Sequence, residues 1–165
     1  LRLPHVYGAH SLLFDRIRHG QIFLPGKGDN LFAHIHIFDA ARALIQAAEN
    51  GRTGIWVVAD ELSCTWNHFF EILQTYHPRL RVTHVPRIIA HVGTKILSVF
   101  FKLTAQANPY PSGAISCWNL RLAVVPGTLR QSIGLEPKFP TIHKGIPDVL
   151  DDAISLYWLP SNLDL

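Results

Sequence analysis

Methionine is missing from all 165 residues of the sequence, and cysteine occurs only twice, at Cys64 and Cys117. Two thiols without a CxxC motif do not make a disulfide framework. We therefore expect a reduced, cytoplasmic protein. The first residues have the pattern of a strand end that runs into a turn at Gly8, and no start methionine precedes them. We expect the chain to begin inside a fold, as a fragment would.

Charged side chains are sparse, at 16% of residues, while hydrophobic ones reach 48%. This composition indicates a globular domain with a core rather than a disordered tail. The net charge is +3, but no run of lysine and arginine exceeds two residues. A nucleic-acid interface needs clustered basic side chains, so the sequence argues against that class of partner.

A long uninterrupted apolar run is also missing. The most apolar stretch, residues 85–104, contains Arg87, His91, Lys95 and Lys102. It therefore falls short of the roughly 20 apolar residues that a membrane-spanning helix needs. Its basic residues would still allow peripheral contact with a membrane surface. A buried or capping helix of a substrate lobe is the simpler expectation.

The familiar catalytic motifs are missing as well. The segment Gly26–Asn30 has the spacing of only two glycines of a GxGxxG dinucleotide loop, and it precedes a strand instead of a helix. No tyrosine has a lysine four residues later, and no GxSxG elbow occurs. His34 and His36 would share one face of a strand, but no companion pair completes a zinc site, so we predict no metal. Cys64 has no evident base partner and is expected to be a small buried residue.

What is present is an alternation of strands and helices. Alternating apolar and histidine positions predict a half-buried strand over 32–38, and a continuous apolar run predicts a buried strand over 54–59. Residues 21–30 are expected to form a loop. Asp39 and Thr65 are the expected N-caps of helices over 40–50 and 66–76. Further elements are expected as strands over 1–6 and 81–85 and as helices over 11–19, 86–104, 128–133 and 143–156.

This alternation favours an α/β architecture with parallel strands. The predicted strands are too few and too short for a whole doubly wound sheet. Residues 1–6 and 54–59 therefore look like edge members of a sheet whose centre lies elsewhere.

Several segments, in order, resemble the extended short-chain dehydrogenases, the family of NAD(P)-dependent epimerases, dehydratases and hydroxysteroid dehydrogenases. The opening Leu-Arg-Leu-Pro-His-Val-Tyr-Gly is similar to the family's Leu-Arg-Pro-x-x-Val-Tyr-Gly. Ile35–Ala43 is similar to its His-Val-x-Asp-x-Ala segment. The other matching segments are Phe14–Gly20, Pro25–Asn30, Gly54–Asp60, Ser63–Thr65 and Leu129–Pro137.

The resemblance implies the C-terminal part of a Rossmann-type NAD(P)-binding fold. Residues 1–60 would supply the last sheet strands and connecting elements, and residues 61–165 a mainly helical substrate-binding lobe. The family's catalytic serine, tyrosine and lysine would precede Leu1, so the chain alone is expected to be inactive. NAD or NADP is the implied cofactor, and a homodimer of the whole enzyme is compatible with it.

The resemblance also implies site residues. Leu3, Pro4, His5 and Val6 would line the nicotinamide side of the cofactor cleft, beyond the carboxyl ends of the strands. The alternative is a plain strand end with a tight turn at Gly8. The expected substrate-binding residues are Tyr7, Phe14, Asn30, Phe32 and His34.

One departure from the family bears on the substrate. Nucleotide-sugar epimerases commonly carry an arginine where this chain has Phe32, and phenylalanine cannot pair with phosphate. We therefore expect an apolar or sterol-like secondary alcohol or ketone as substrate. Two alternatives stay open: a nucleotide-sugar epimerase or dehydratase of the same family, and a non-catalytic binding domain on the same scaffold. In each case, residues 1–6 and 55–58 would expose apolar surface and strand edges that invite association.

Overall fold

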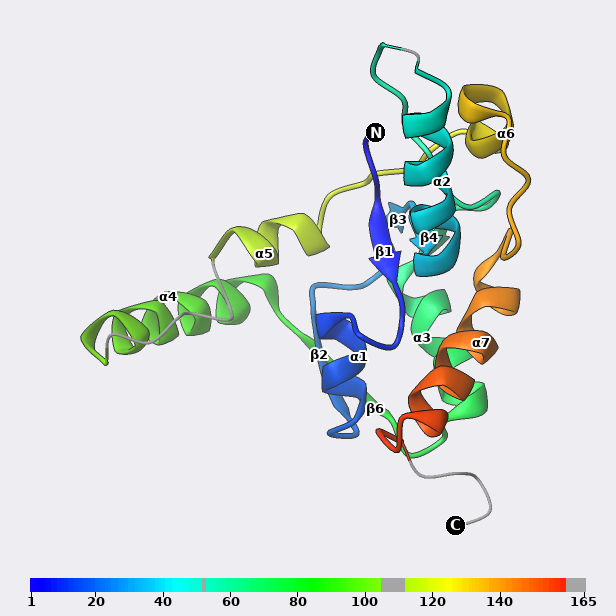
Figure 1. The fold of residues 1–165 in the computed structure, drawn as a ribbon. Helices are drawn as coiled ribbons and strands as arrows, with labels where there is room; N and C mark the ends of the chain where they lie inside the picture. Colours follow the sequence, from blue (N-terminus) through cyan, green and yellow to red (C-terminus); the bar gives the residue numbers. More distant parts are fainter. Residues whose placement is uncertain (52, 105–111, 160–165) are drawn as a thin grey trace.

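The computed structural model describes residues 1–51, 53–104 and 112–159. Its described part is an α/β structure in which three two-stranded sheets lie among helices (Figure 1). Helices α4 and α5 form an arm that projects from the remaining elements (Figure 1). This architecture confirms the expected mixture of helices and parallel strands.

The first sheet pairs β1, His5–Tyr7, with β4, His34–His36, in parallel. An isolated parallel bridge joins Arg2 to Val57 just upstream of β1. In it, the amide of Arg2 donates to the Trp56 carbonyl over 2.7 Å, and the amide of Val58 donates to the Arg2 carbonyl over 3.3 Å. The segments predicted as strands over 1–6 and 54–59 are therefore adjacent and parallel, although a single bridge joins them.

The expected burial of residues 54–59 is only partly correct. Val58 and Ala59 are buried, whereas Ile55 is 71% exposed. Only the bridge to Arg2 joins this segment to another strand in the described chain. Without a second neighbour the apolar run stays extended and does not become a regular strand.

The second sheet corrects the loop predicted over 21–30. Residues Gln21–Pro25 form β2, which pairs in parallel with β6, Arg81–Val85. Ile22 and Leu24 are buried and Phe23 is exposed. This period-of-two pattern is the strand signal, and the following Pro25 and Gly26 obscured it. The turn proper begins at Gly26, whose φ of 86° suits glycine.

The third sheet and the second helix correct the strand predicted over 32–38. Residues Leu31–Phe32 form β3, antiparallel to β5, Cys64–Thr65. Helix α2, Ile37–Glu49, starts directly after β4. Its N-cap is His36, whose Nδ1 accepts the amide of Phe38, so Asp39 is not the cap. Both His34 and His36 are buried rather than facing a polar cleft or solvent.

Except for α5, which the sequence did not predict, the remaining helices agree closely with the sequence pattern. The Ser11 hydroxyl caps α1, Leu12–Ile17, and the Thr65 hydroxyl caps α3, Trp66–Tyr76. Left-handed Gly134 ends α6, Thr128–Ile133. The other helices are α4 (Arg87–Leu103), α5 (Ser112–Trp118) and α7 (Ile142–Ser155). The proline and glycine residues over 108–113 also predict a loop; residues 108–111 lie outside the described ones, and Ser112 and Gly113 begin α5 instead.

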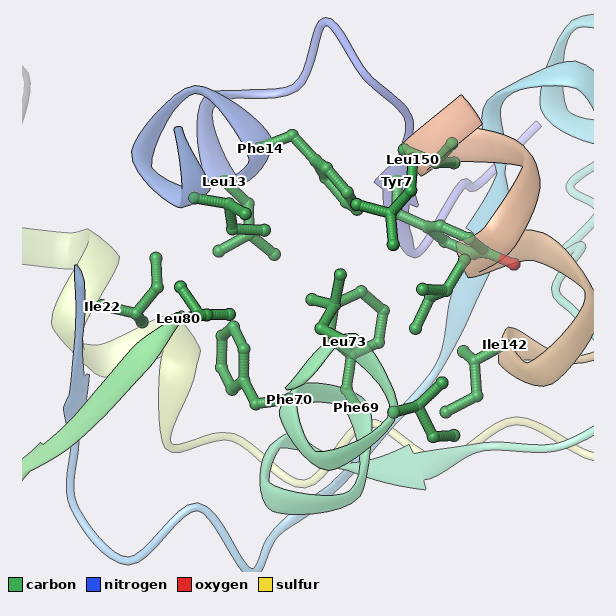
Figure 2. Packing of buried hydrophobic residues seen from close by; sticks show 14 of the residues in the cluster. Tyr7, Leu13, Phe14, Ile22, Phe69, Phe70, Leu73, Leu80, Ile142 and Leu150 are labelled. Atoms are coloured by element: carbon green, nitrogen blue, oxygen red, sulfur yellow. The ribbon is translucent and has the colours of Figure 1, made fainter. Parts of the chain in front are cut away.

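The main hydrophobic core lies between α1, α3, α7 and the strands β1 and β2. Figure 2 shows Tyr7 and Phe14 facing Phe69 and Leu73, with Ile142 and Leu150 of α7 beside them. The core thus joins side chains from both parts into which the sequence was divided, residues 1–60 and 61–165. A smaller cluster packs α2 against α6 through Ala43 and Leu129.

Candidate functional site

A cleft of about 1000 Å³ opens between the N-terminal segment, α1, β2, α3 and the arm. Its size suits a cofactor or substrate of drug-like dimensions. The side chains that line it are predominantly apolar, with several aromatic rings. They include Leu3, Pro4, His5, Phe32, Trp66, Ala90, Gly93, Thr94, Leu97 and Trp118.

The parallel bridge between Arg2 and Val57 positions one wall of the cleft. Leu3, Pro4 and His5 follow Arg2 directly, so they lie where this short parallel pair ends. Ligands of open parallel sheets bind beyond the carboxyl ends of the strands. The structure therefore brings three of the four predicted cofactor residues to the cleft. The fourth, Val6, packs against the smaller core cluster instead.

Aromatic rings form the wall that faces this segment. Phe32 stacks on Trp66 with ring centroids 3.6 Å apart and planes inclined by 9°. Trp118 of α5 lies 4.2 Å from the Trp66 ring. Phe32 reaches this position from β3 and Trp66 from the first turn of α3, because β3 pairs with β5 immediately before α3. Phe32 and Trp66 are 4% and 6% exposed and belong to the main core, so these rings form a packed apolar wall of the cleft.

Two polar atoms in the cleft are buried without a hydrogen-bond partner among the described residues. They are Nε2 of His5 and Nε1 of Trp66. Burial lowers the pKa of His5 to about 4, so its imidazole is neutral near pH 7. A neutral ring nitrogen can donate or accept one hydrogen bond, and the indole N–H can only donate. A polar group of a bound ligand would supply the hydrogen-bond partner that each of these two atoms lacks.

The other predicted substrate residues lie elsewhere. Tyr7 and Phe14 are buried in the main core, to which Phe32 also belongs, and His34 is buried beside it against Tyr7 and Phe69. The Asn30 amide donates to the carbonyls of Trp118 over 3.0 Å and Leu120 over 2.8 Å. Asn30 thereby ties the loop after β2 to the arm, which helps to shape the cleft.

A buried polar network that sequence reasoning missed surrounds Asp60. The Tyr7 hydroxyl donates to Asp60 Oδ2 over 3.0 Å, and the His36 amide donates to Oδ1 over 3.3 Å. His34 Nε2 lies 3.5 Å from Asp60 Oδ2, and His34 Nδ1 lies 3.8 Å from the Cys64 thiol. The sequence signal for this network was Asp60 itself, an acidic residue directly after the apolar run over 54–59.

Burial keeps this network uncharged near neutral pH. It raises the pKa of Asp60 to about 8 and lowers the pKa of His34 to about 4. The 3.5 Å approach of His34 and Asp60 is therefore a contact of neutral groups rather than an ion pair. Burial also raises the pKa of the Cys64 thiol to about 12, so Cys64 is not an activated nucleophile.

A second hollow of about 630 Å³ lies at the turn after β2. Lys27, His84 and Arg87 line it, together with Asp29. Val85 lines both this hollow and the apolar cleft, so the two are neighbours. The hollow supplies the positive charge that the cleft wall at Phe32 lacks.

The described residues offer neither a metal site nor a membrane-spanning helix. Over residues 1–51, 53–104 and 112–159, no three histidine, cysteine, aspartate or glutamate side chains are grouped to hold a metal ion. Likewise, none of the described helices is both long and apolar enough to cross a membrane.

Comparison with known proteins gives matches at the level of structure. No family model and no curated protein sequence matches this chain. Among solved structures, the ADP-L-glycero-D-manno-heptose-6-epimerase of Helicobacter pylori matches with a TM-score of 0.63 and 16% identity, over 93% of this chain and 43% of its own. UDP-glucose 4-epimerase of Thermotoga maritima, solved with UDP-glucose, matches with a TM-score of 0.63 and 15% identity, over 94% and 45%.

A third similar structure is the dTDP-glucose 4,6-dehydratase of Bacillus anthracis, solved in complex with NAD. It matches with a TM-score of 0.60 and 15% identity, over 93% of this chain and 43% of its own. The chain thus spans less than half the length of each of these three proteins. Nearly all of it superposes on them, which confirms the expected fold. Over that part of their length, the chain has the Rossmann-type α/β fold of these two epimerases and this dehydratase.

Proposed function

We propose that this chain is the substrate-side part of an NAD(P)-dependent epimerase or dehydratase that acts on a nucleotide sugar. The observation that carries the proposal is the pairing of an aromatic cleft with an adjacent basic hollow. Three similar structures support it, because each is an enzyme of a nucleotide-activated sugar by its name. A nucleotide sugar therefore replaces the apolar alcohol or ketone as the substrate that we favour.

The two neighbouring spaces suit the two halves of such a substrate. A diphosphate needs cationic side chains, which Lys27 and Arg87 would provide in the hollow. The sugar ring would lie in the cleft near Phe32 and Trp66. The arginine that nucleotide-sugar enzymes commonly carry at the position of Phe32 would then be replaced in function by charges from the neighbouring turn and from α4.

The residues of the cleft also fit a nicotinamide. Leu3 and Pro4 offer an apolar surface to a ring. His5 Nε2 is a buried polar atom without a hydrogen-bond partner among the described residues. Bound NAD or NADP would supply hydride transfer to and from the substrate carbon. The chain's own part would be to bind the ring, orient it through His5 and exclude water with Phe32, Trp66 and Trp118.

The proton that accompanies hydride transfer needs a group outside these 165 residues. The family's Tyr-x-x-x-Lys pair does not occur in the sequence. We therefore propose that the chain alone neither binds the cofactor tightly nor turns over substrate. Its division into sheet elements over 1–60 and a substrate lobe over 61–165, a homodimer of the whole enzyme and a cytoplasmic location remain predictions.

A second candidate is a dehydrogenase of an apolar secondary alcohol or ketone. Its support is the lining of the cleft, where Leu3, Leu97 and Phe32 surround the space. This candidate would leave the basic hollow without a role. A non-catalytic binding domain would be a third candidate only if the whole protein lacked the catalytic pair.

The first test is the coding sequence on the 5′ side of Leu1. A glycine-rich strand–turn–helix followed by Tyr-x-x-x-Lys is expected there, and a start codon beside Leu1 would overturn the enzyme assignment. The second test is NAD(P) reduction and product analysis with the complete protein. Conversion of UDP- or dTDP-glucose, without response to a sterol alcohol, is expected. The opposite pattern would select the second candidate.

A further inference from the structure

Helix α4 carries an apolar stripe on the side that faces away from the cleft. The stripe consists of Ile88, Val92, Ile96, Val99 and Leu103. At about 100° per residue, these five positions fall within about 80° of one another around the helix axis. All are more than half exposed, from 51% at Val92 to 81% at Leu103. A contiguous apolar surface of this kind marks an interaction site.

The other side of the same helix already has a role. Ala90, Gly93, Thr94 and Leu97 line the cleft. Figure 1 shows α4 projecting from the remaining elements, with α5 lying beside it. The outer stripe is therefore presented by a protruding element and lies on a different face from the one that serves the ligand site.

Basic residues border the outer stripe along one flank. Arg87, His91, Lys95 and Lys102 again fall within about 80° of one another around the axis. The helix contains neither aspartate nor glutamate. An apolar face flanked by lysine and arginine is the pattern of a helix that lies in a membrane interface.

The charge pattern extends well beyond the helix. No acidic residue occurs in the sequence between Glu71 and Glu136, a segment that also contains β6, α4 and α5. Seven of the 15 lysine and arginine residues fall in this segment: Arg79, Arg81, Arg87, Lys95, Lys102, Arg121 and Arg130. All 12 acidic residues lie outside it, so the small net charge of the chain hides a strong asymmetry.

Another exposed apolar face shows why the charge matters. Helix α2 exposes Leu44 and Ile45 but contains Asp39 and Glu49 against a single Arg42. Helix α2 therefore has no excess of basic side chains that would favour an anionic surface. Only on α4 do exposed apolar residues coincide with uncompensated positive charge among the described helices.

We propose that α4 is a membrane-docking helix that binds the surface of an anionic phospholipid bilayer. The outer stripe enters the boundary between headgroups and acyl chains, and Lys95 and Lys102 lie among the lipid phosphates. With 17 residues, or about 25 Å, the helix lies along the surface instead of crossing the bilayer. The proposal goes beyond the proposed enzyme activity and holds for either substrate class. It places the cleft, which α4 also lines, beside the bilayer.

Vesicle flotation of the purified chain tests this proposal. One set of vesicles contains phosphatidylcholine alone, and the other also contains about one third phosphatidylserine. We expect binding to the anionic vesicles that is at least about tenfold tighter and that weakens as salt is raised. Equal binding to both sets, or no binding at low salt, would overturn the proposal.

Two matched pairs of variants locate the contact. Ile96→Glu should abolish binding, whereas Ile45→Glu, at a similarly exposed isoleucine of α2, should not. Lys95→Glu with Lys102→Glu should weaken binding to anionic vesicles by at least about tenfold, whereas Lys144→Glu on α7 should not. Circular dichroism must first show each variant folded. If Ile96→Glu instead dissociates a dimer in sedimentation and leaves vesicle binding intact, the stripe is a self-association surface and the proposal fails.

Discussion

The hydroxyl of Tyr7 donates a hydrogen bond to Asp60 Oδ2 over 3.0 Å, although 53 positions separate the two residues in the sequence. The bond links the end of β1 to the end of the segment that forms the bridge with Arg2. Both groups are buried, at 0% and 2% exposure. The Tyr7 ring is also packed so closely on α7 that a Cβ on Gly145 would lie 2.8 Å from its Cζ. Tyr7 is therefore a structural residue that holds the sheet, the helix and the polar network together.

Removing that hydroxyl should cost stability. Tyr7→Phe leaves one buried oxygen of Asp60 without its donor, so we expect the free energy of unfolding to fall by about 1–3 kcal/mol. Tyr157→Phe is the control, because Tyr157 is 96% exposed and should change stability by less than about 0.5 kcal/mol. Urea denaturation measures both. Equal effects of the two substitutions would contradict the structural role of Tyr7.

The same network predicts how stability depends on pH. The pKa of Asp60 is raised from 3.8 to about 8, so the folded state retains a proton that the unfolded state has lost. This contribution is complete below pH 3.8 and disappears as the pH rises through 8. The lowered pKa values of His5 and His34, about 4 instead of 6.5, act in the opposite direction between pH 4 and 6.5. Stability should thus rise toward pH 6.5 and then fall toward pH 8.

Asp60→Asn isolates the carboxyl contribution. Asparagine does not titrate, so the fall between pH 6.5 and 8 should flatten, while the rise below pH 6.5 should persist because both histidines remain. Thermal or urea unfolding across this range, in matched buffers, measures the difference. A variant whose profile parallels the parent protein between pH 6.5 and 8 would show that Asp60 does not titrate there.

Asp39 should contribute more to stability than a surface carboxylate. Its buried side chain accepts the amides of Lys138 over 2.9 Å and Phe139 over 2.7 Å, and Arg42 Nη1 lies at 3.0 Å. Asp39→Ala leaves these amides unpaired and should destabilise the fold by at least about 2 kcal/mol. Asp15→Ala, which removes only the exposed pair with Arg18, should cost less than about 1 kcal/mol. If both substitutions cost the same, Asp39 does not anchor the segment at 138–139.

The sequence predicted the elements whose signals are local. Thr65 caps α3 and Gly134 ends α6 at the predicted positions, because a hydroxyl cap and a left-handed glycine act within one turn. β2 was missed since its pairing with β6 joins residues 60 positions apart, whereas Pro25 and Gly26 give a strong nearby turn signal. The N-cap at His36 was missed for a related reason. Aspartate is the usual cap, and here tertiary contacts with the 138–139 segment engage Asp39.

The sequence predicted only those cleft residues whose position follows from the order of the strands along the chain. Leu3 and Pro4 line the cleft just after the bridge at Arg2, and His5 and Phe32 line it from the paired strands β1 and β3. Tyr7 and His34 each lie two positions after a cleft residue and yet are buried, because the cleft ends before them, and the strand pattern alone does not reveal where it ends. Trp66 was assigned to a helix face, and its place in the cleft depends on the pairing of β3 with β5.

The basic hollow beside the cleft should matter for the binding of a nucleotide sugar and not for the binding of NAD. If Lys27 and Arg87 hold a diphosphate, Lys27→Ala combined with Arg87→Ala should weaken the binding of UDP-glucose by at least about tenfold, since two charge-assisted contacts are lost. NAD binding by the complete protein should change little, because the proposed nicotinamide contacts are Leu3, Pro4 and His5. Lys144→Ala, on the exposed surface of α7, controls for the loss of a surface cation away from the hollow and should leave both affinities unchanged. Calorimetric titration of each ligand distinguishes the outcomes. A double variant that binds UDP-glucose as well as the parent protein would remove the hollow from the substrate site and favour the apolar alcohol.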